Sequence, residues 1–305
     1  MTSPRARALA LTVAATATAL VLAGCGDDDP KNTASDPGSS DDATSSPADG
    51  APTSEPSQAE SSGVPETVTV PIYFVGDGPD GPVLFREFRA VEADNPMAEA
   101  LALLAAGDAL DRDYRTPFPD GASFKDDASY DESILVNLAD DTATTRPQGM
   151  STAEAKVSVQ ALVYTLQGIV QNRSPVSVHF DGRPTTLLGI DTSGGVKAAP
   201  ELDVLNLVSV TTPEEGRTVS GSFTASGVAS SFEATVPWEI RQGDQVVKEG
   251  FATAEGWLEK LYPWETEVDV SDLAPGEYTF VALTDDPSGG EGRGPSEDSK
   301  TIIVG

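Results

Sequence analysis

The chain of 305 residues contains one cysteine and one histidine, and its basic residues are far fewer than its acidic ones. A single cysteine excludes an internal disulfide, and a single histidine excludes metal sites that need several imidazole ligands. With 19 Lys and Arg against 49 Asp and Glu, the formal charge is −30. A surface this acidic is repelled by nucleic acid and by anionic lipid headgroups. The chain also lacks a GxxxxGK[ST] motif and a Gly-rich dinucleotide turn, which argues against nucleotide binding.

The single cysteine, Cys25, follows a segment that has the features of an export signal. Arg5 and Arg7 precede an apolar run from Ala8 to Ala23. This run is short and rich in Ala and Thr, whereas a membrane-spanning helix needs about 20 strongly apolar residues. We therefore expect residues 1–24 to be a signal peptide.

The residues directly before Cys25, which are Leu22, Ala23 and Gly24, resemble the lipobox of bacterial lipoproteins. The resemblance implies that the cysteine is S-acylated with diacylglycerol and that cleavage leaves it as the first residue of the mature chain. An ordinary signal peptide with a chance cysteine and a short uncleaved anchor are the alternatives. Two acyl chains bind a bilayer without help from charge. We therefore expect an exported protein, anchored by lipid to the outer face of the cytoplasmic membrane.

Residues 25–65 combine the lipidated cysteine with a linker of low complexity. Residues 26–65 are rich in Ser, Thr, Ala, Pro, Gly and acids, and Val64 is their only large aliphatic residue. Such a segment cannot bury enough apolar surface to offset its chain entropy, so it predicts a disordered tether. A flexible coil of this length spans roughly 35 Å root-mean-square. It would hold the folded domains away from the membrane.

Residues 66–199 have the mixed pattern of an α+β domain. Thr67–Val75 is β-branched and aromatic, and a run rich in Gly, Asp and Pro separates it from Val83–Val91. This arrangement predicts two strands around a turn. Asn95 and Pro96 predict the start of a helix, and Gly107 predicts its end.

A second helix and a strand follow in the same domain. Ser151 and Glu154 match a capping box, in which the Ser side chain caps the first turn and the Glu returns the bond. The apolar residues behind it form one helical stripe: Val159, Leu162, Val163, Leu166, Ile169 and Val170. Val176, Val178 and Phe180 then alternate as in a strand. Strands interspersed with two one-faced helices predict an α+β layer.

This domain matches a known family in five segments: Pro71–Phe74, Leu84–Arg89, Ala98–Gly107, Ala161–Leu166 and Val176–Arg183. Together they resemble the GerMN domain, over about residues 67–195. GerMN domains occur in sporulation, germination and other envelope lipoproteins, and no catalytic set is attributed to the family. The resemblance therefore implies an envelope protein of this kind, but no specific chemistry.

Residues 200–305 have short strands and no convincing helix. The candidate strands are Val204–Val210, Thr218–Ala225, Phe232–Ile240, Val246–Phe251, Val268–Val270, Tyr278–Leu283 and Thr301–Val304. About seven strands in about 100 residues predict an all-β immunoglobulin-like sandwich without a disulfide. In Phe232–Ile240 we expect Phe232, Ala234, Val236, Trp238 and Ile240 to share one face.

Five parts of this second domain again follow a known pattern: Pro213 with Gly216, Val219–Phe223 with Gly227, Phe232–Glu239, Glu249–Phe251 and Thr301–Val304. They resemble the Gmad-type immunoglobulin-like domain, which often follows GerMN in proteins related to spore germination. Because a GerMN domain followed by a Gmad-type domain is a known arrangement, finding the two resemblances in this order supports both.

The sequence offers few candidates for catalysis or metal binding. His179 shares a strand face with Ser177, which predicts a solvated histidine, since no nucleophile or orienting group can be named beside it. Glu233 and Glu239 would lie roughly 20 Å apart on one strand, too far for a pair of glycosidase carboxylates. The acidic pairs do not follow a calcium-loop spacing. They are Asp126–Asp127, Asp140–Asp141 and Asp285–Asp286. We expect no catalytic residue, no metal site and no cofactor.

The densest aromatic cluster contains Trp257, Tyr262 and Trp264, with Leu258 and Leu261 between them. Two interpretations stay open. The cluster is part of the core or a strand edge, or it is an interaction patch for a partner protein or a wall glycan, because Trp and Tyr are favoured interface anchors.

We therefore expect a non-enzymatic, membrane-anchored lipoprotein of the cell envelope. Its two domains would act as a protein-interaction or scaffolding factor, with envelope proteins as partners and no binding to nucleic acid. The alternative is a module that binds peptidoglycan or another carbohydrate of the cell wall. Retention on purified wall glycan, blocked by soluble glycan, would favour that alternative.

Overall fold

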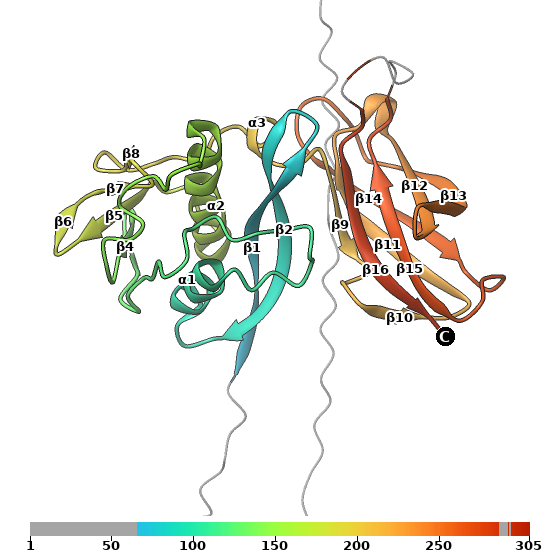
Figure 1. The fold of residues 1–305 in the computed structure, drawn as a ribbon, viewed down its shortest axis with the longest axis horizontal. Helices are drawn as coiled ribbons and strands as arrows, with labels where there is room; N and C mark the ends of the chain where they lie inside the picture. The colour runs from blue at the N-terminus through green and yellow to red at the C-terminus, as the bar shows by residue number, and fades with distance from the viewer. Residues whose placement is uncertain (1–65, 287–291, 293) are drawn as a thin grey trace, which may run out of the picture. The chain divides into compact units, whose positions relative to one another are not determined.

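The structure, a computed structural model, describes residues 66–286, 292 and 294–305 (Figure 1). The first part has the expected α+β architecture. Its elements, in chain order, are β1 (Thr67–Gly78), β2 (Gly81–Glu92), α1 (Pro96–Ala106), β3 (Ser129–Tyr130), β4 (Ile134–Asn137), α2 (Thr152–Val170), β5 (Val176–Phe180), β6 (Arg183–Pro184), β7 (Thr186–Leu187), β8 (Ile190–Asp191) and α3 (Glu201–Val204).

A long antiparallel hairpin, β1–β2, pairs along the whole length of both strands. Ile72 and Phe74 of β1 are fully buried in the core. Tyr73 lies between them in the sequence and therefore points to the opposite face, since side chains alternate along a strand. Its direct partner in β2 is Arg86. The pairing places a phenol and a guanidinium side by side on one face of the hairpin.

The two main helices begin at the caps that the sequence predicts, but the returning bond of the capping box is not found among the described residues, because the carboxylate of Glu154 accepts from Arg115 at 3.5 Å instead. The side chain of Asn95 accepts a hydrogen bond from the amide of Ala98, and that of Ser151 accepts from the amide of Glu154 at 3.0 Å. Helix α1 ends at Gly107, whose φ of 68° is a left-handed conformation that glycine adopts without strain. Helix α2 runs along the outer edge of β1, where the hydroxyl of Thr165 accepts from the amide of Tyr73 at 3.0 Å.

A second, mixed sheet has the order β3-β4-β5-β6, with β4 and β5 parallel. Its apolar side chains pack with those of the hairpin and of both helices into one core. The largest fully buried side chains of this core are Ile72, Phe74, Leu101, Leu104, Ile134, Leu138, Leu162, Leu166, Leu187 and Leu188.

The second part is the predicted all-β sandwich. Its elements are β9 (Val208–Thr212), β10 (Arg217–Val219), β11 (Ser222–Ala229), the 3-10 turn η1 (Phe232–Ala234), β12 (Thr235–Gln242), β13 (Gln245–Thr253), β14 (Tyr262–Asp269), β15 (Gly276–Leu283) and β16 (Glu297–Val304). One sheet has the order β10-β16-β15-β12-β13 and the other the order β14-β11-β9. Val208, Val236, Ile240, Val268, Phe280 and Ile302, all fully buried, form the centre between the sheets.

The expected strand Phe232–Ile240 is wrong at its beginning. Glu233 and Ala234 have φ values of 52° and 61°, so the chain turns there, and strand β12 begins only at Thr235. Phe232 is 40% exposed and does not join the inward-facing row. From Val236 onwards the alternation holds, because Val236, Trp238 and Ile240 are buried. Positive φ at non-glycine residues leaves no signal in the hydrophobic pattern.

The described residues of both parts belong to one compact unit, Ser61–Gly305. Leu84 of β2 forms a parallel bridge with Leu205, and its carbonyl accepts from the amide of Asn206 at 2.9 Å. The side-chain amide of Asn206 donates to the carbonyls of Val208 and Glu297. The segment Leu205–Asn206, which connects the two parts, is thus bonded to the hairpin and to the sandwich. In the part of the chain that the structure describes, none of the helices has the length and hydropathy of a membrane-spanning segment.

Candidate functional site

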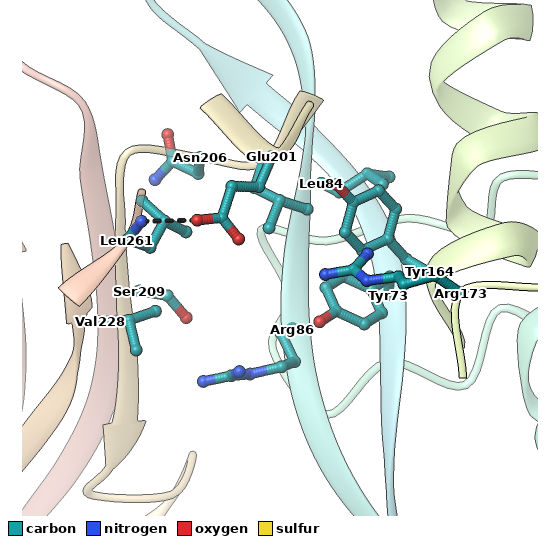
Figure 2. A pocket seen from close by; sticks show the side chains of 11 residues that line it. Tyr73, Leu84, Arg86, Tyr164, Arg173, Glu201, Asn206, Ser209, Val228 and Leu261 are labelled. Carbon is teal, nitrogen blue, oxygen red and sulfur yellow. Dashed lines mark hydrogen bonds between the residues drawn. The ribbon is translucent and has the colours of Figure 1, made fainter. Parts of the chain in front are cut away.

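A cavity of about 210 Å³ lies where the hairpin, the end of α2 and the sandwich meet (Figure 2). Its lining contains more polar than apolar residues. The apolar residues are Leu84, Leu205, Val228 and Leu261, and the polar ones are Tyr73, Arg86, Tyr164, Arg173, Glu201, Asn206 and Ser209.

Arg86 reaches into the cavity from the middle of β2. Its guanidinium carbon lies 4.7 Å from the centre of the Phe88 ring, and its Nη2 donates to the hydroxyl of Thr211 at 3.4 Å. The Nε–H is buried and has no hydrogen-bond partner within the described protein. The side chain is therefore held in place, but its hydrogen-bonding capacity is only partly used.

Tyr73 and Tyr164 form an aromatic wall. Their ring centres are 5.3 Å apart with an interplanar angle of 55°, and the hydroxyl of Tyr164 donates to the carbonyl of Ala199 at 2.7 Å. The guanidinium of Arg173, from the loop after α2, lies 5.4 Å from the centre of the Tyr164 ring. Burial raises the pKa of both phenols, against the opposing charges of Arg86 at Tyr73 and of Arg173 at Tyr164. Both phenols are therefore neutral at physiological pH.

Glu201 and Ser209 complete the polar side of the cavity. Oε1 of Glu201 accepts from the amide of Leu261 at 2.9 Å, which fixes the carboxylate. Ser209, in β9, is 5% exposed, and its hydroxyl has no partner among the described residues. Figure 2 shows both guanidinium groups, the carboxylate and the serine hydroxyl arranged around the same hollow.

The two arginines of the cavity form no salt bridge with a described carboxylate, a state that they share with several exposed basic residues, such as Lys156 and Arg183. Arg89, Arg115, Arg241, Lys248 and Lys300 each form a salt bridge. Within the described ranges, neither Arg86 nor Arg173 has a carboxylate within salt-bridge distance. The cavity therefore combines two guanidinium groups that form no salt bridge with the single carboxylate of Glu201, and this excess of positive charge in a strongly acidic protein favours an anion.

A buried ionic cluster lies beside the cavity and joins the two parts of the chain. The ammonium of Lys300 in β16 lies 2.5 Å from Oδ2 of Asp111 and 3.2 Å from Oδ1 of Asp298. The hydroxyl of Tyr114 donates to Asp298 at 2.5 Å, and the amide of Val210 donates to its other oxygen at 2.6 Å. All four charged or phenolic side chains are at most 7% exposed.

The loop that carries Asp111 and Tyr114 is held by the hairpin. Glu87 of β2, which is buried, accepts from the amides of Leu110 and Asp111 at 2.9 and 3.0 Å. The ring of Tyr114 stacks on Phe85 at 4.7 Å. The hairpin thus fixes the loop, and the loop fixes the cluster at the sandwich.

The cluster shifts the titration of its members. Burial, together with the charges of Asp298 and Asp111, raises the pKa of Tyr114 well above its usual value. Burial also raises the pKa of Asp298, against the attraction of Lys300. Burial opposes the charge of Lys300, but Asp298 and Asp111 outweigh it, so the pKa of the ammonium is raised. Lys300 is therefore a cation at any physiological pH, held between two carboxyl groups.

The aromatic cluster of the second domain does not lie on one face. Trp264 is 3% exposed and packs in the core of the sandwich. Tyr262 is half-buried against that core. Trp257 is also half-buried and lies edge-on to Phe232, with ring centres 5.1 Å apart. The Trp264 position fits the core interpretation, whereas Trp257 lies near the surface beside the exposed Leu258.

The remaining candidates from the sequence stand apart from the cavity. His179 is half-buried in β5 and pairs with Pro184 of β6. Among the described residues, no group of three potential metal ligands is found. Leu22, Ala23, Gly24 and Cys25 lie outside the described residues.

The cavity residues carried little signal in the sequence. Tyr73 could have been noticed, because the alternation of β1 turns it away from Ile72 and Phe74. Glu201 and Ser209 could not have been identified from the sequence, because more than 100 residues separate them from Arg86 and only the folded chain brings them together.

Comparison with known proteins identifies two matching family models. Residues 71–186 match the model described as "Sporulation and spore germination". Residues 207–291 match the model described as "Immunoglobulin-like domain of bacterial spore germination". No curated protein matches the chain.

Several solved structures are similar. The tandem GerMN domains of the sporulation protein GerM from Bacillus subtilis align at 15% identity and a TM-score of 0.34, over 68% of this chain and 62% of that one. The first GerMN domain of the same protein aligns at 16% identity and a TM-score of 0.30, over 46% of this chain and 97% of that one. Fibronectin(III)-like modules of CbhA from Clostridium thermocellum align at 18% identity and a TM-score of 0.22, over 32% of this chain and 93% of that one. This chain thus spans less than two thirds of the tandem GerM structure.

Proposed function

We propose that this chain, which contains a GerMN domain followed by a Gmad-type immunoglobulin-like domain, is a non-catalytic scaffolding factor of the cell envelope. Its relation to sporulation and germination proteins is given by the two family matches. In this proposal the domains bind envelope proteins through a surface to which both contribute. The tether and a diacylglyceryl group on Cys25 hold that surface outside the membrane.

The observation that carries the proposal is the buried ionic cluster around Lys300. In this cluster, buried charged groups from both domains contact each other. Removal of one partner from a buried ion pair is strongly destabilising, so the cluster holds the two domains together. A buried cluster of this kind fixes the orientation of the two domains, and therefore of their binding surfaces, relative to each other. Independent domains on a flexible linker would not need it.

Crosslinking in native membranes tests the scaffolding role. Cells that carry the wild-type chain would be crosslinked, and the attached proteins identified by mass spectrometry. We expect one reproducible set of envelope proteins. The Lys300→Met variant, in which the cluster is weakened, should capture fewer of them, while the exposed-site control Lys156→Met should match the wild type. An absence of protein partners, or hydrolysis of wall material by the purified chain, would contradict the proposal.

The membrane anchor has a separate test. The mass of the native N-terminus should correspond to Cys25 carrying a diacylglyceryl group, and the chain should be found in the membrane fraction. A Cys25→Ser chain should be released. A soluble wild-type product with an unmodified thiol would refute the anchor without affecting the role of the folded domains.

A further inference from the structure

We infer that the cavity between Tyr73, Arg86, Arg173 and Glu201 is a binding site for a sugar acid, a monosaccharide unit that carries one carboxylate. This site goes beyond the scaffolding role and does not depend on it. The inference rests on three features of the lining: its unpaired cations, its unused hydrogen-bond acceptors and its aromatic wall.

The cations select an anionic group. Arg86 and Arg173 approach the hollow from different elements, and within the described residues no carboxylate pairs with either. A guanidinium presents parallel N–H donors that match the two oxygens of a carboxylate. The buried Nε–H of Arg86 is one such donor without a partner.

Glu201 restricts the charge of the ligand. One of its oxygens is bonded to the amide of Leu261, which leaves the other available in the same cavity. A phosphate with two negative charges would be repelled by this carboxylate, because like charges disfavour each other at short range. A ligand with a single carboxylate and additional hydroxyl donors satisfies both the arginines and Glu201.

Two buried acceptors call for such donors. The hydroxyl of Ser209, in a side chain that is 5% exposed, has no partner within the described protein. The Oε1 atom of Gln167 also has no hydrogen-bond partner within the described protein. The Gln167 side chain is 4% exposed and lines an adjoining cavity of about 240 Å³. Leaving such groups unsatisfied is costly, and they are usually bonded to something. Ligand hydroxyl groups would satisfy them.

The shape of the site fits a sugar ring. The adjoining cavity shares Tyr73, Tyr164 and Arg173 with the first and adds the amide side chains of Gln167, Gln171 and Asn172. The rings of the two tyrosines offer an apolar wall to the C–H face of a sugar, and amides bond hydroxyl and acetamido groups. Polar groups spaced around a small aromatic surface are typical of ligand sites.

Titration calorimetry on the purified full-length chain in detergent micelles tests the inference. N-acetylmuramic acid and N-acetylglucosamine differ only in the lactyl ether that carries the carboxylate, so they form a matched pair of probes. We expect the acid to bind and the neutral sugar to bind at least about 10-fold more weakly, as for the loss of a charge-assisted hydrogen bond. No binding of the acid, equal binding of both sugars, or tighter binding of inorganic phosphate would overturn the inference.

Two variants connect the binding to this cavity. Arg173→Gln changes an exposed loop residue, so folding should be unaffected, and the affinity for N-acetylmuramic acid should fall by about 10-fold. Arg183→Gln, an equally exposed arginine in β6 outside the cavity, should leave the affinity unchanged. Equal effects of the two variants would show that general charge attracts the acid, and would overturn the assignment. Neither result bears on the crosslinking of envelope proteins.

Discussion

Lys300 shows how a single side chain in this molecule can link two domains. It is 5% exposed and contacts Asp111, Tyr114 and Asp298 at once. Burial of a charge is unfavourable unless it is paired and hydrogen-bonded. Here Lys300 has a carboxyl group on each side, so its charge is tolerated where the loop between α1 and β3 meets β16.

Replacement of Lys300 by Met should therefore destabilise the folded protein strongly. The variant leaves two carboxyl groups facing each other without a cation, and we expect the free energy of unfolding to fall by about 3–5 kcal/mol. Denaturation with urea measures the change. Lys156→Met, at an exposed position of α2, should change stability by less than about 0.5 kcal/mol. Equal effects of the two substitutions would mean that the cluster contributes nothing specific.

At the scale of elements, strand β11 packs closely against β9 at Gly227. The register between β11 and β9 shifts between Ser226 and Gly227. A Cβ atom at position 227 would collide with the carbonyl of Ser209 and lie 3.0 Å from the Trp264 ring. Glycine at this point therefore allows β9 and Trp264 to pack against β11.

Gly227→Ala should push β9 away from β11, and we expect a loss of at least about 2 kcal/mol in the free energy of unfolding. Gly194→Ala is the matched control, because nothing lies within 4 Å of a Cβ there and the backbone has no positive φ. Thermal unfolding of both variants measures the difference. A Gly227→Ala protein as stable as the control would contradict the close packing of the two strands.

The elements also show what the sequence could predict. The caps at Asn95 and Ser151, the left-handed end at Gly107 and the alternation from Val236 to Ile240 are local signals, and the structure confirms them. The turn at Phe232 was missed because positive φ is imposed by the fold. The cavity and the ionic cluster around Lys300 could not be predicted, because their members come from both domains and no local sequence pattern indicates contacts between distant residues.

At the scale of the whole molecule, stability should fall at alkaline pH. The raised pKa of Lys300 means that its stabilising contribution is complete below 10.5, its ordinary value, and is lost as the pH rises through its value in the folded protein. The raised pKa of Tyr114 acts in the same direction, because above pH 10.0 the unfolded chain releases the phenolic proton more readily. Urea denaturation between pH 8 and 11 should show a decline, with a smaller slope in Lys300→Met. A constant stability over this range would contradict both shifts.

The proposed scaffolding role and the inferred sugar-acid site both require the α+β domain and the immunoglobulin-like sandwich to behave as one body. Differential scanning calorimetry of the purified full-length chain tests this claim most directly. We predict a single cooperative transition for the wild type, and two separate transitions for Lys300→Met, in which the domains no longer share the cluster. Two independent transitions in the wild type would contradict the account.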